Sequence, residues 1–141
     1  PEYHDPAFMK LVEDCCCDLV GKDRVKFDYE SWSTGSSDFG DVTGVMPGVQ
    51  FFAAGAIGTG HGIDYHVKDP NRMCVNAVKA QLFVADALLR DDAAAARKII
   101  ADYKPQYPSI KAYLDAINEL FLDKDAVQYD EHGNATVDFQ N

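Results

Sequence analysis

A nearly unbroken apolar run, Val49 to Ala54, places the strongest limit on what this chain can fold into. A short run of this kind is typical of a strand that is covered on both faces. Such a strand needs sheet neighbours on both sides, because an open edge invites pairing with another chain. The chain offers few candidate strands, so we expect the neighbours to come from another segment or from a partner chain.

Two helices are predicted, one on each side of this run. Asp5-Pro6 supplies an N-cap and a first-turn proline, apolar residues then recur at the helical period, and Gly21 ends the first helix. Asp69-Pro70 repeats the start signal and opens a helix that reaches about Leu89.

Between the first helix and the apolar run, residues 25–29 alternate as a short strand and residues 31–44 have the composition of a polar, glycine-rich loop. The order predicts an α/β fold for residues 1–91, as a partial α/β/α layer with few strands and long helices. The helix after Asp69-Pro70 is expected to pack across the strand at Val49–Ala54.

Residues 92–141 are predicted to form a helical extension and a terminal β-hairpin. A short alanine-rich helix ends near Tyr103, a second helix covers about 110–121, and two alternating segments flank a turn between 126 and 139. We expect the two helices to pack on each other through apolar residues of both, namely Ile99, Ile110, Leu114, Ile117 and Phe121.

The net charge of the chain excludes some classes of binding partner. A formal net charge of −10 argues against nucleic acid, which requires a basic face, and against an anionic membrane surface. No apolar run approaches the roughly 20 residues that span a bilayer. The four cysteines contain no CxxC pair and are expected to be reduced, as in a cytoplasmic protein.

His61 is the first candidate for a chemical role. It lies in a glycine-rich loop, Gly55 to Gly62, directly after the predicted buried strand, where α/β proteins bind ligands and metals. Neutral imidazole is a common zinc ligand, although a plain surface-loop histidine fits the same position. His66 follows five residues later, but the segment between them is not helical in pattern, so a paired motif is weakly supported.

The segment Ser36-Ser37-Asp38-Phe39-Gly40-Asp41 is the second candidate. Its two carboxylates, flanked by hydroxyls and glycines, could orient a metal-bound histidine or bind a polar substrate. A loop that caps a short helical turn needs the same residue types, so both interpretations stay open.

The order of these motifs resembles the closing part of the M20 metallopeptidase family. Ser36 to Val42, then Met46-Pro47, the run Val49–Ala54 and Gly58-Thr59-Gly60-His61 are similar to the Ser-Thr-Asp-x-Gly-Asp loop, strand and histidine loop of its amidohydrolase branch. That branch includes aminobenzoyl-glutamate hydrolases and aminoacylase-like proteins. The likeness covers about residues 5 to 90.

The resemblance implies a metal-dependent amidohydrolase that acts on an N-acyl amino acid or an aminobenzoyl-glutamate-like substrate. His61 would bind one of two metal ions, most often zinc, with manganese or cobalt as alternatives. Substrate-binding or supporting roles are implied for the loop residues Gly35, Ser36, Ser37, Asp38 and Asp41. The parent enzyme is expected to be a cytoplasmic homo-oligomer.

The catalytic base and the other metal ligands of the family belong to an N-terminal segment, and no matching cluster precedes residue 31. A zinc site needs three or four protein ligands. We therefore expect this chain to be the C-terminal stretch of a catalytic domain, inactive alone, with the remainder of that domain or a partner subunit required. Two alternatives are a non-catalytic assembly module and a small α/β domain that binds a polar ligand.

Overall fold

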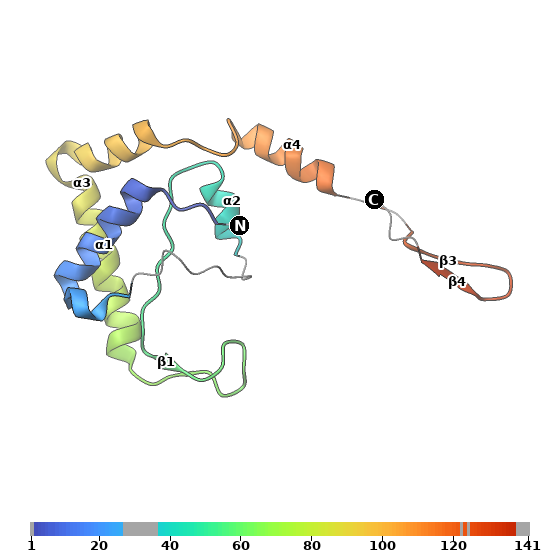
Figure 1. The fold of residues 1–141 in the computed structure, drawn as a ribbon, viewed down its shortest axis with the longest axis horizontal. Coiled ribbons are helices and arrows are strands. Elements are labelled where there is room, and N and C mark those ends of the chain that lie inside the picture. The colour runs from blue at the N-terminus through green and yellow to red at the C-terminus, as the bar shows by residue number, and fades with distance from the viewer. Residues whose placement is uncertain (1, 27–36, 122, 124, 138–141) are drawn as a thin grey trace. The chain divides into compact units, whose positions relative to one another are not determined.

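The computed structural model describes residues 2–26, 37–121, 123 and 125–137 (Figure 1). The chain forms two compact units, Pro1–Gln106 and Tyr107–Asn141. Helices outweigh strands, and both are present, which agrees with the α/β class in its general sense. The compact units divide further along the chain than the predicted boundary between residues 91 and 92.

The first helix, α1, covers Pro6–Val20 and confirms the predicted signals at both ends. Asp5 Oδ1 accepts a hydrogen bond from the Phe8 amide at 2.8 Å, which satisfies one of the free donors of the first turn. Gly21 ends the helix with a φ of 87°, a conformation that favours glycine. A short 3-10 turn, η1, follows at Lys22–Arg24.

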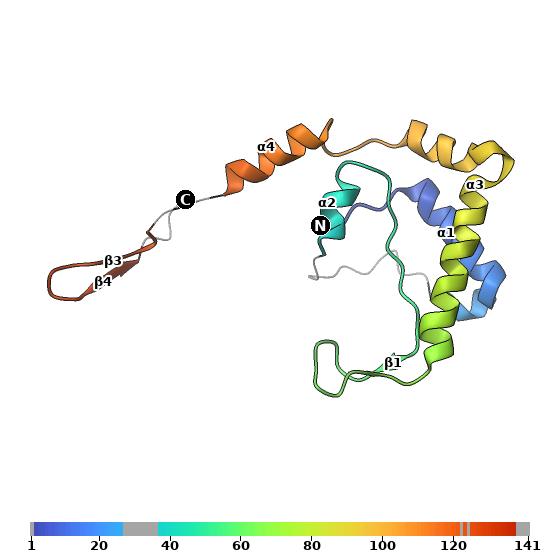
Figure 2. The same ribbon diagram turned by 180° about the vertical axis from the view of Figure 1, so that it is seen from behind.

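The long helix α3 covers Asn76–Asp102 and is preceded by a π-helical turn, η2, at Asn71–Val75. Asp69 Oδ1 accepts from the Arg72 amide at 3.0 Å, so the predicted start at Asp69-Pro70 is confirmed. α1 and α3 lie side by side in both views of the first unit (Figures 1 and 2). Val12 and Cys15 of α1 meet Val84 of α3 in the core.

α3 is sharply bent, because Asp91, Asp92 and Ala93 adopt left-handed φ angles of 53°, 58° and 57°. Left-handed backbone costs roughly 1–2 kcal/mol for each L residue, so packing beyond the bend must offset it. Ile99 is buried there, and the Tyr103 hydroxyl donates to the carbonyl of the fully buried Thr43. The bend therefore folds the second half of α3 back onto the first unit.

Val49–Ala54 does not form the predicted interior strand. The segment runs as an elongated stretch beside the helices (Figure 1), and in the described part of the chain it belongs to no sheet. Val49 and Phe51 pack against the core formed by α1 and α3. The predicted contact between this segment and the helix after Asp69-Pro70 is therefore present. The strand is missing because no described segment lies alongside to complete a hydrogen-bonded ladder.

Two other predictions for the first unit need correction or lie outside the described residues. The predicted loop 31–44 contains a short helix, α2, at Phe39–Thr43, so its second half is helical. Of the predicted strand 25–29, Val25 and Lys26 lie outside any strand, and the remaining residues are not described. Among the described residues of this unit, the one sheet is a pair of two-residue strands, which is treated with the site below.

The second unit contains α4, at Ile110–Leu120, and the hairpin of β3 (Val127–Tyr129) with β4 (Ala135–Val137). Ser109 Oγ accepts from the Ala112 amide and begins α4. The hairpin was predicted and is confirmed. In its turn, hydrogen bonds from the Asn134 side chain and amide hold the pKa of the Asp130 carboxyl below its usual range.

The predicted packing between the helix before Tyr103 and α4 is not part of either unit. Ile99 belongs to the first unit and is buried in it, and Ile110 and Phe121 belong to the second unit. Within the described residues, no helix is long and apolar enough to cross a membrane.

Candidate functional site

His61 lies at the tip of a small hairpin. β1 (Ala56–Ile57) pairs antiparallel with β2 (His66–Val67), and the chain between them forms the loop that carries the histidine. His61 itself is exposed and has a φ of 62°, a left-handed conformation that histidine adopts more readily than most residues. The loop was predicted to follow a buried strand, and the structure instead places it within a two-stranded turn.

Asp64 holds this loop in shape. Its carboxylate oxygens accept hydrogen bonds from the Thr59 amide at 3.1 and 3.2 Å, and the Gly62 amide donates to the Thr59 carbonyl at 2.7 Å. Gly58 has a φ of 102°, and a Cβ there would lie 2.4 Å from the Asp64 carbonyl oxygen. The glycine therefore permits a close backbone approach that fixes where His61 projects.

His66 has the hydrogen-bond pattern of a histidine that is ready to bind a metal. Its Nδ1 lies 2.8 Å from the Asp64 carbonyl oxygen. Because a carbonyl can only accept, Nδ1 carries the proton, and in the neutral ring Nε2 keeps its lone pair. Metal-binding histidines commonly donate in this way to a backbone carbonyl. Sequence spacing gave this residue little weight, since the hydrogen bond depends on the turn that Asp64 makes.

Replacing Gly58 with alanine should open the His61 loop without unfolding the helices. The added Cβ meets backbone rather than a flexible side chain, and the left-handed φ adds strain of about 1–3 kcal/mol. We expect amide exchange at Lys68 and Asp69, which both donate to the Gly55 carbonyl, to quicken by about 10-fold or more. Exchange in α1 should stay unchanged.

Gly60 supplies the matched control for this variant. A Cβ at Gly60 meets no atom within 4 Å, and its φ is not left-handed. Gly60→Ala should therefore leave amide exchange across the hairpin as it is in the unmodified chain. Equal exchange in the two variants would show that Gly58 does not shape the loop.

The second candidate segment begins α2. Ser37 Oγ accepts from the Phe39 amide at 3.1 Å, and the Ser37 carbonyl accepts from the Gly40 amide at 3.0 Å. Asp38 stands at the N-cap position but makes no side-chain cap bond, and both Asp38 and Asp41 are exposed. The arrangement matches a loop that caps a helical turn, and it leaves both carboxylates available. Gly35 and Ser36 lie outside the described residues.

The structure does not bring the two candidate segments together. α2 and the His61 hairpin lie at opposite ends of the elongated segment in both views (Figures 1 and 2). Among the residues described, no group of three or more histidine, cysteine, aspartate or glutamate side chains could hold a metal ion. These residues do not by themselves fit a zinc site, which needs three or four ligands.

The cysteines do not change this conclusion. All four are free, and they range from the buried Cys15 to the exposed Cys74. Burial raises the pKa of the Cys15 and Cys16 thiols, which disfavours the thiolate that metals bind. Of the four, only Cys15 is buried, and Cys16 and Cys17 are partly exposed.

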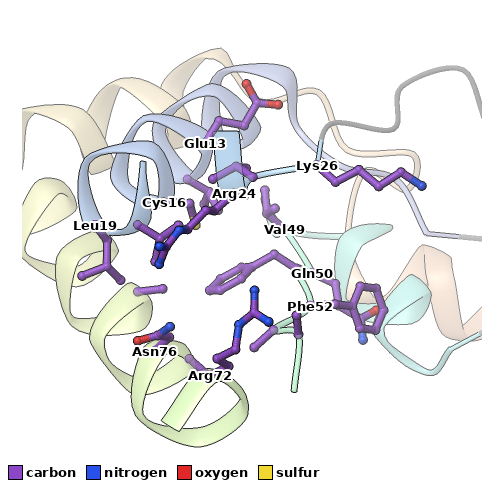
Figure 3. Close-up of a pocket in the computed structure, with 18 of the residues that line it drawn as sticks. Glu13, Cys16, Leu19, Arg24, Lys26, Val49, Gln50, Phe52, Arg72 and Asn76 are labelled. Carbon is purple, nitrogen blue, oxygen red and sulfur yellow. The ribbon is translucent and has the colours of Figure 1, made fainter. Parts of the chain in front are cut away.

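A large cavity in the first unit was not predicted from the sequence. It has a volume of about 990 Å³ and lies between α1, the start of α3 and the elongated segment (Figure 3). Its wall combines apolar side chains with charged ones of both signs, namely Arg24, Lys26 and Arg72 on one hand and Glu13 and Asp69 on the other. Among the predicted site residues that the structure describes, namely His61, Ser37, Asp38 and Asp41, none lines it. The one sequence feature related to this cavity is the apolar run Val49–Ala54, which lines it and for which the chain offers few strand neighbours.

Comparison of the chain with models of protein families, with curated proteins and with solved structures finds no match.

Proposed function

We propose that this chain is part of a metal-dependent amidohydrolase of the M20 kind and supplies one metal-binding histidine, His61, and a pocket loop that contains Asp38 and Asp41. The observation that carries the proposal is the order and spacing of the two loops on either side of Val49–Ala54. The hydrogen-bonded hairpin supports it, because it holds an exposed imidazole at a fixed position.

The substrate class that follows from the resemblance is an N-acyl amino acid or an aminobenzoyl-glutamate-like amide. In the complete enzyme, His61 would contribute a neutral ring nitrogen to one of two zinc ions, which polarise the amide carbonyl and activate water when bound. The hydroxyl and carboxylate groups of the Ser37–Asp41 segment would bind polar groups of the substrate. The remaining ligands and the general base would come from the rest of a cytoplasmic, homo-oligomeric enzyme.

The isolated chain should be inactive. Because the described residues hold fewer than three clustered ligands, zinc should bind only weakly, and the chain should cleave neither an N-acyl amino acid nor aminobenzoyl-glutamate. Isothermal titration with zinc and a chromatographic assay of amide cleavage measure both quantities. Hydrolysis by the 141-residue chain with added zinc would contradict the proposal that it is one part of the catalytic unit.

A non-catalytic assembly module is the second candidate, and the unpaired apolar segment favours it. The two functions differ in the role of His61. In an assembly module, His61→Ala would leave the activity of the assembled complex unchanged, whereas a metal ligand cannot be removed without loss of turnover.

A further inference from the structure

The helix α2 is too short to hold the pocket loop in position by itself. It has five residues, Phe39–Thr43, and Asp38 at its N-cap position makes no side-chain cap bond. Isolated helices shorter than roughly 12 residues are marginal in water. The pocket loop, Ser37–Asp41, which continues into α2, therefore depends on tertiary contacts for its position.

Thr43, the last residue of α2, is the point where these tertiary contacts meet. Its side chain is completely buried. Its Oγ1 accepts a hydrogen bond from the Tyr3 amide at 3.0 Å and donates to the carbonyl of Gly40, in the pocket loop, at 3.2 Å. A Cβ added at Gly48 would lie 2.9 Å from Thr43 Cγ2, so the chain that follows α2 packs directly against this residue.

The carbonyl of Thr43 receives its hydrogen bond from a side chain 60 residues later in the chain, because the Tyr103 hydroxyl donates to it. The last carbonyls of a helix have no partner within the helix, and a buried carbonyl without a partner is destabilising. Burial raises the pKa of Tyr103, so its hydroxyl stays protonated and able to donate. Tyr103 therefore caps the C-terminal end of α2 from another part of the fold.

The bend in α3 brings Tyr103 to this position. Asp91, Asp92 and Ala93 all have left-handed φ angles, and backbone strain of this kind persists only where the surrounding structure holds it, often near a functional site. Ile99, which is buried, and Tyr103 are four residues apart beyond the bend and share one face of the helix. Continued as a straight helix, the same stretch would extend about 20 Å away from the bend.

We propose that Tyr103 is a positioning residue: the left-handed turn at Asp91–Ala93 presents its hydroxyl to the Thr43 carbonyl, and this contact holds the Ser37–Asp41 loop in the arrangement that binds polar groups of the substrate. The inference rests on the proposed function in taking this loop to be part of the substrate site. Tyr103 and the turn both lie beyond residue 90, outside the segment that resembles the M20 family.

The first test uses Tyr103→Phe in the 141-residue chain and metal-free buffer, because this change keeps the ring and removes only the hydroxyl. Hydrogen exchange is the readout. We expect exchange of the Gly40, Asp41 and Gly44 amides, which are hydrogen-bonded within the loop and α2, to quicken by about 5- to 10-fold. Exchange of the Gly21 amide at the end of α1 should stay unchanged, whereas global unfolding would quicken both regions.

Tyr107→Phe is the matched control. It makes the same chemical change at a half-buried tyrosine of the second unit, whose ring packs edge to face on Tyr113. Amide exchange in α2 should be the same in this variant as in the unmodified chain.

Two variants at Ala93 test the turn and leave Tyr103 in place. Glycine adopts left-handed angles readily, whereas the proline ring fixes φ near about −65°, which is incompatible with this turn. Ala93 has a φ of 57°, so Ala93→Gly should leave α2 exchange unchanged and Ala93→Pro should quicken it at least as much as Tyr103→Phe. Adding Tyr103→Phe to Ala93→Pro should have no further effect, because both changes remove the same contact.

The second test measures steady-state kinetics in the complete enzyme. Tyr103→Phe should raise KM for the amide substrate by about 5- to 10-fold and leave kcat within about 2-fold, because the loop binds the substrate whereas His61 and its metal ion are untouched. Ala93→Gly and Tyr107→Phe should keep the KM of the unmodified enzyme. A purely structural role for Tyr103 would instead lower the amount of active enzyme and leave KM unchanged.

Two results would overturn the inference. One is equal α2 exchange in the Tyr103→Phe variant and the unmodified chain. The other is faster exchange together with an unchanged KM, because Tyr103 would then only stabilise the fold. Absence of amide cleavage by the unmodified complete enzyme would contradict the proposed function, and the exchange test, which needs neither metal nor substrate, would still decide whether Tyr103 holds the loop.

Discussion

Replacing His61 with alanine in the complete enzyme should lower kcat for amide hydrolysis by more than about 100-fold, because even indirect partners of metal ligands contribute 10- to 100-fold. The fold should survive, since His61 is exposed at the tip of a hairpin and contributes nothing to the α1–α3 core. Steady-state kinetics and thermal unfolding of the same preparation measure the two effects separately.

His132→Ala is the control for this prediction. His132 is also an exposed histidine in a hairpin turn, and it belongs to the second unit, whereas the predicted site residues belong to the first. We expect its kcat and unfolding temperature to match those of the unmodified enzyme. Normal turnover in the His61→Ala variant would contradict the assignment of His61 as a metal ligand.

Ile99→Ala should lower the free energy of unfolding of the first unit by about 2–5 kcal/mol, the range for truncation of a buried isoleucine. Ile99 is 6% exposed, whereas its neighbour Ile100, on the same helix, is 66% exposed. Ile100→Ala should therefore change stability by no more than about 0.5 kcal/mol. Urea unfolding of both variants, followed by circular dichroism, gives the comparison.

The outcome of this pair decides where the second half of α3 belongs. A large effect at Ile99 alone supports the bend at Asp91–Ala93, which packs this helix half onto the first unit. Small and equal effects at both positions would show that the helix beyond the bend does not contribute to the core.

Helix ends were the features best predicted from the sequence, because capping is local chemistry. Asp5, Gly21 and Asp69 each act within three or four residues of their own position, so residue type and spacing suffice to place the ends. The hairpin after residue 126 was predicted for the same reason, since its turn is made by residues that are neighbours in sequence.

The strand predicted at Val49–Ala54 is the clearest case in which local sequence was insufficient. A pattern of side chains can specify a strand, but a strand forms only when another segment completes the ladder. The break between two helices at this point was predicted, because the first was expected to reach about Leu89 and a second to end near Tyr103, and the structure has non-helical residues at 90–93. The left-handed angles of the bend were not predicted, because Ile99 and Tyr103 stabilise the bent arrangement from a distance.

The sequence predicted the two loops of the candidate site separately. It did not predict how the two loops are placed relative to each other. The sequence identified His61 and the Ser36–Asp41 segment, yet their distance from each other depends on strands that this chain does not contain in its described part. The hydrogen bond of His66 depends on the backbone turn at Asp64, so residue type alone could not reveal it.

The central claim is most directly tested by the crystal structure of the complete parent enzyme soaked with zinc, with anomalous scattering recorded at the zinc edge. The account predicts a zinc ion about 2.0–2.1 Å from a ring nitrogen of His61, with its other ligands from residues outside this chain or from the Asp38–Asp41 loop. Zinc ions bound entirely by other residues, with His61 in solvent, would contradict it.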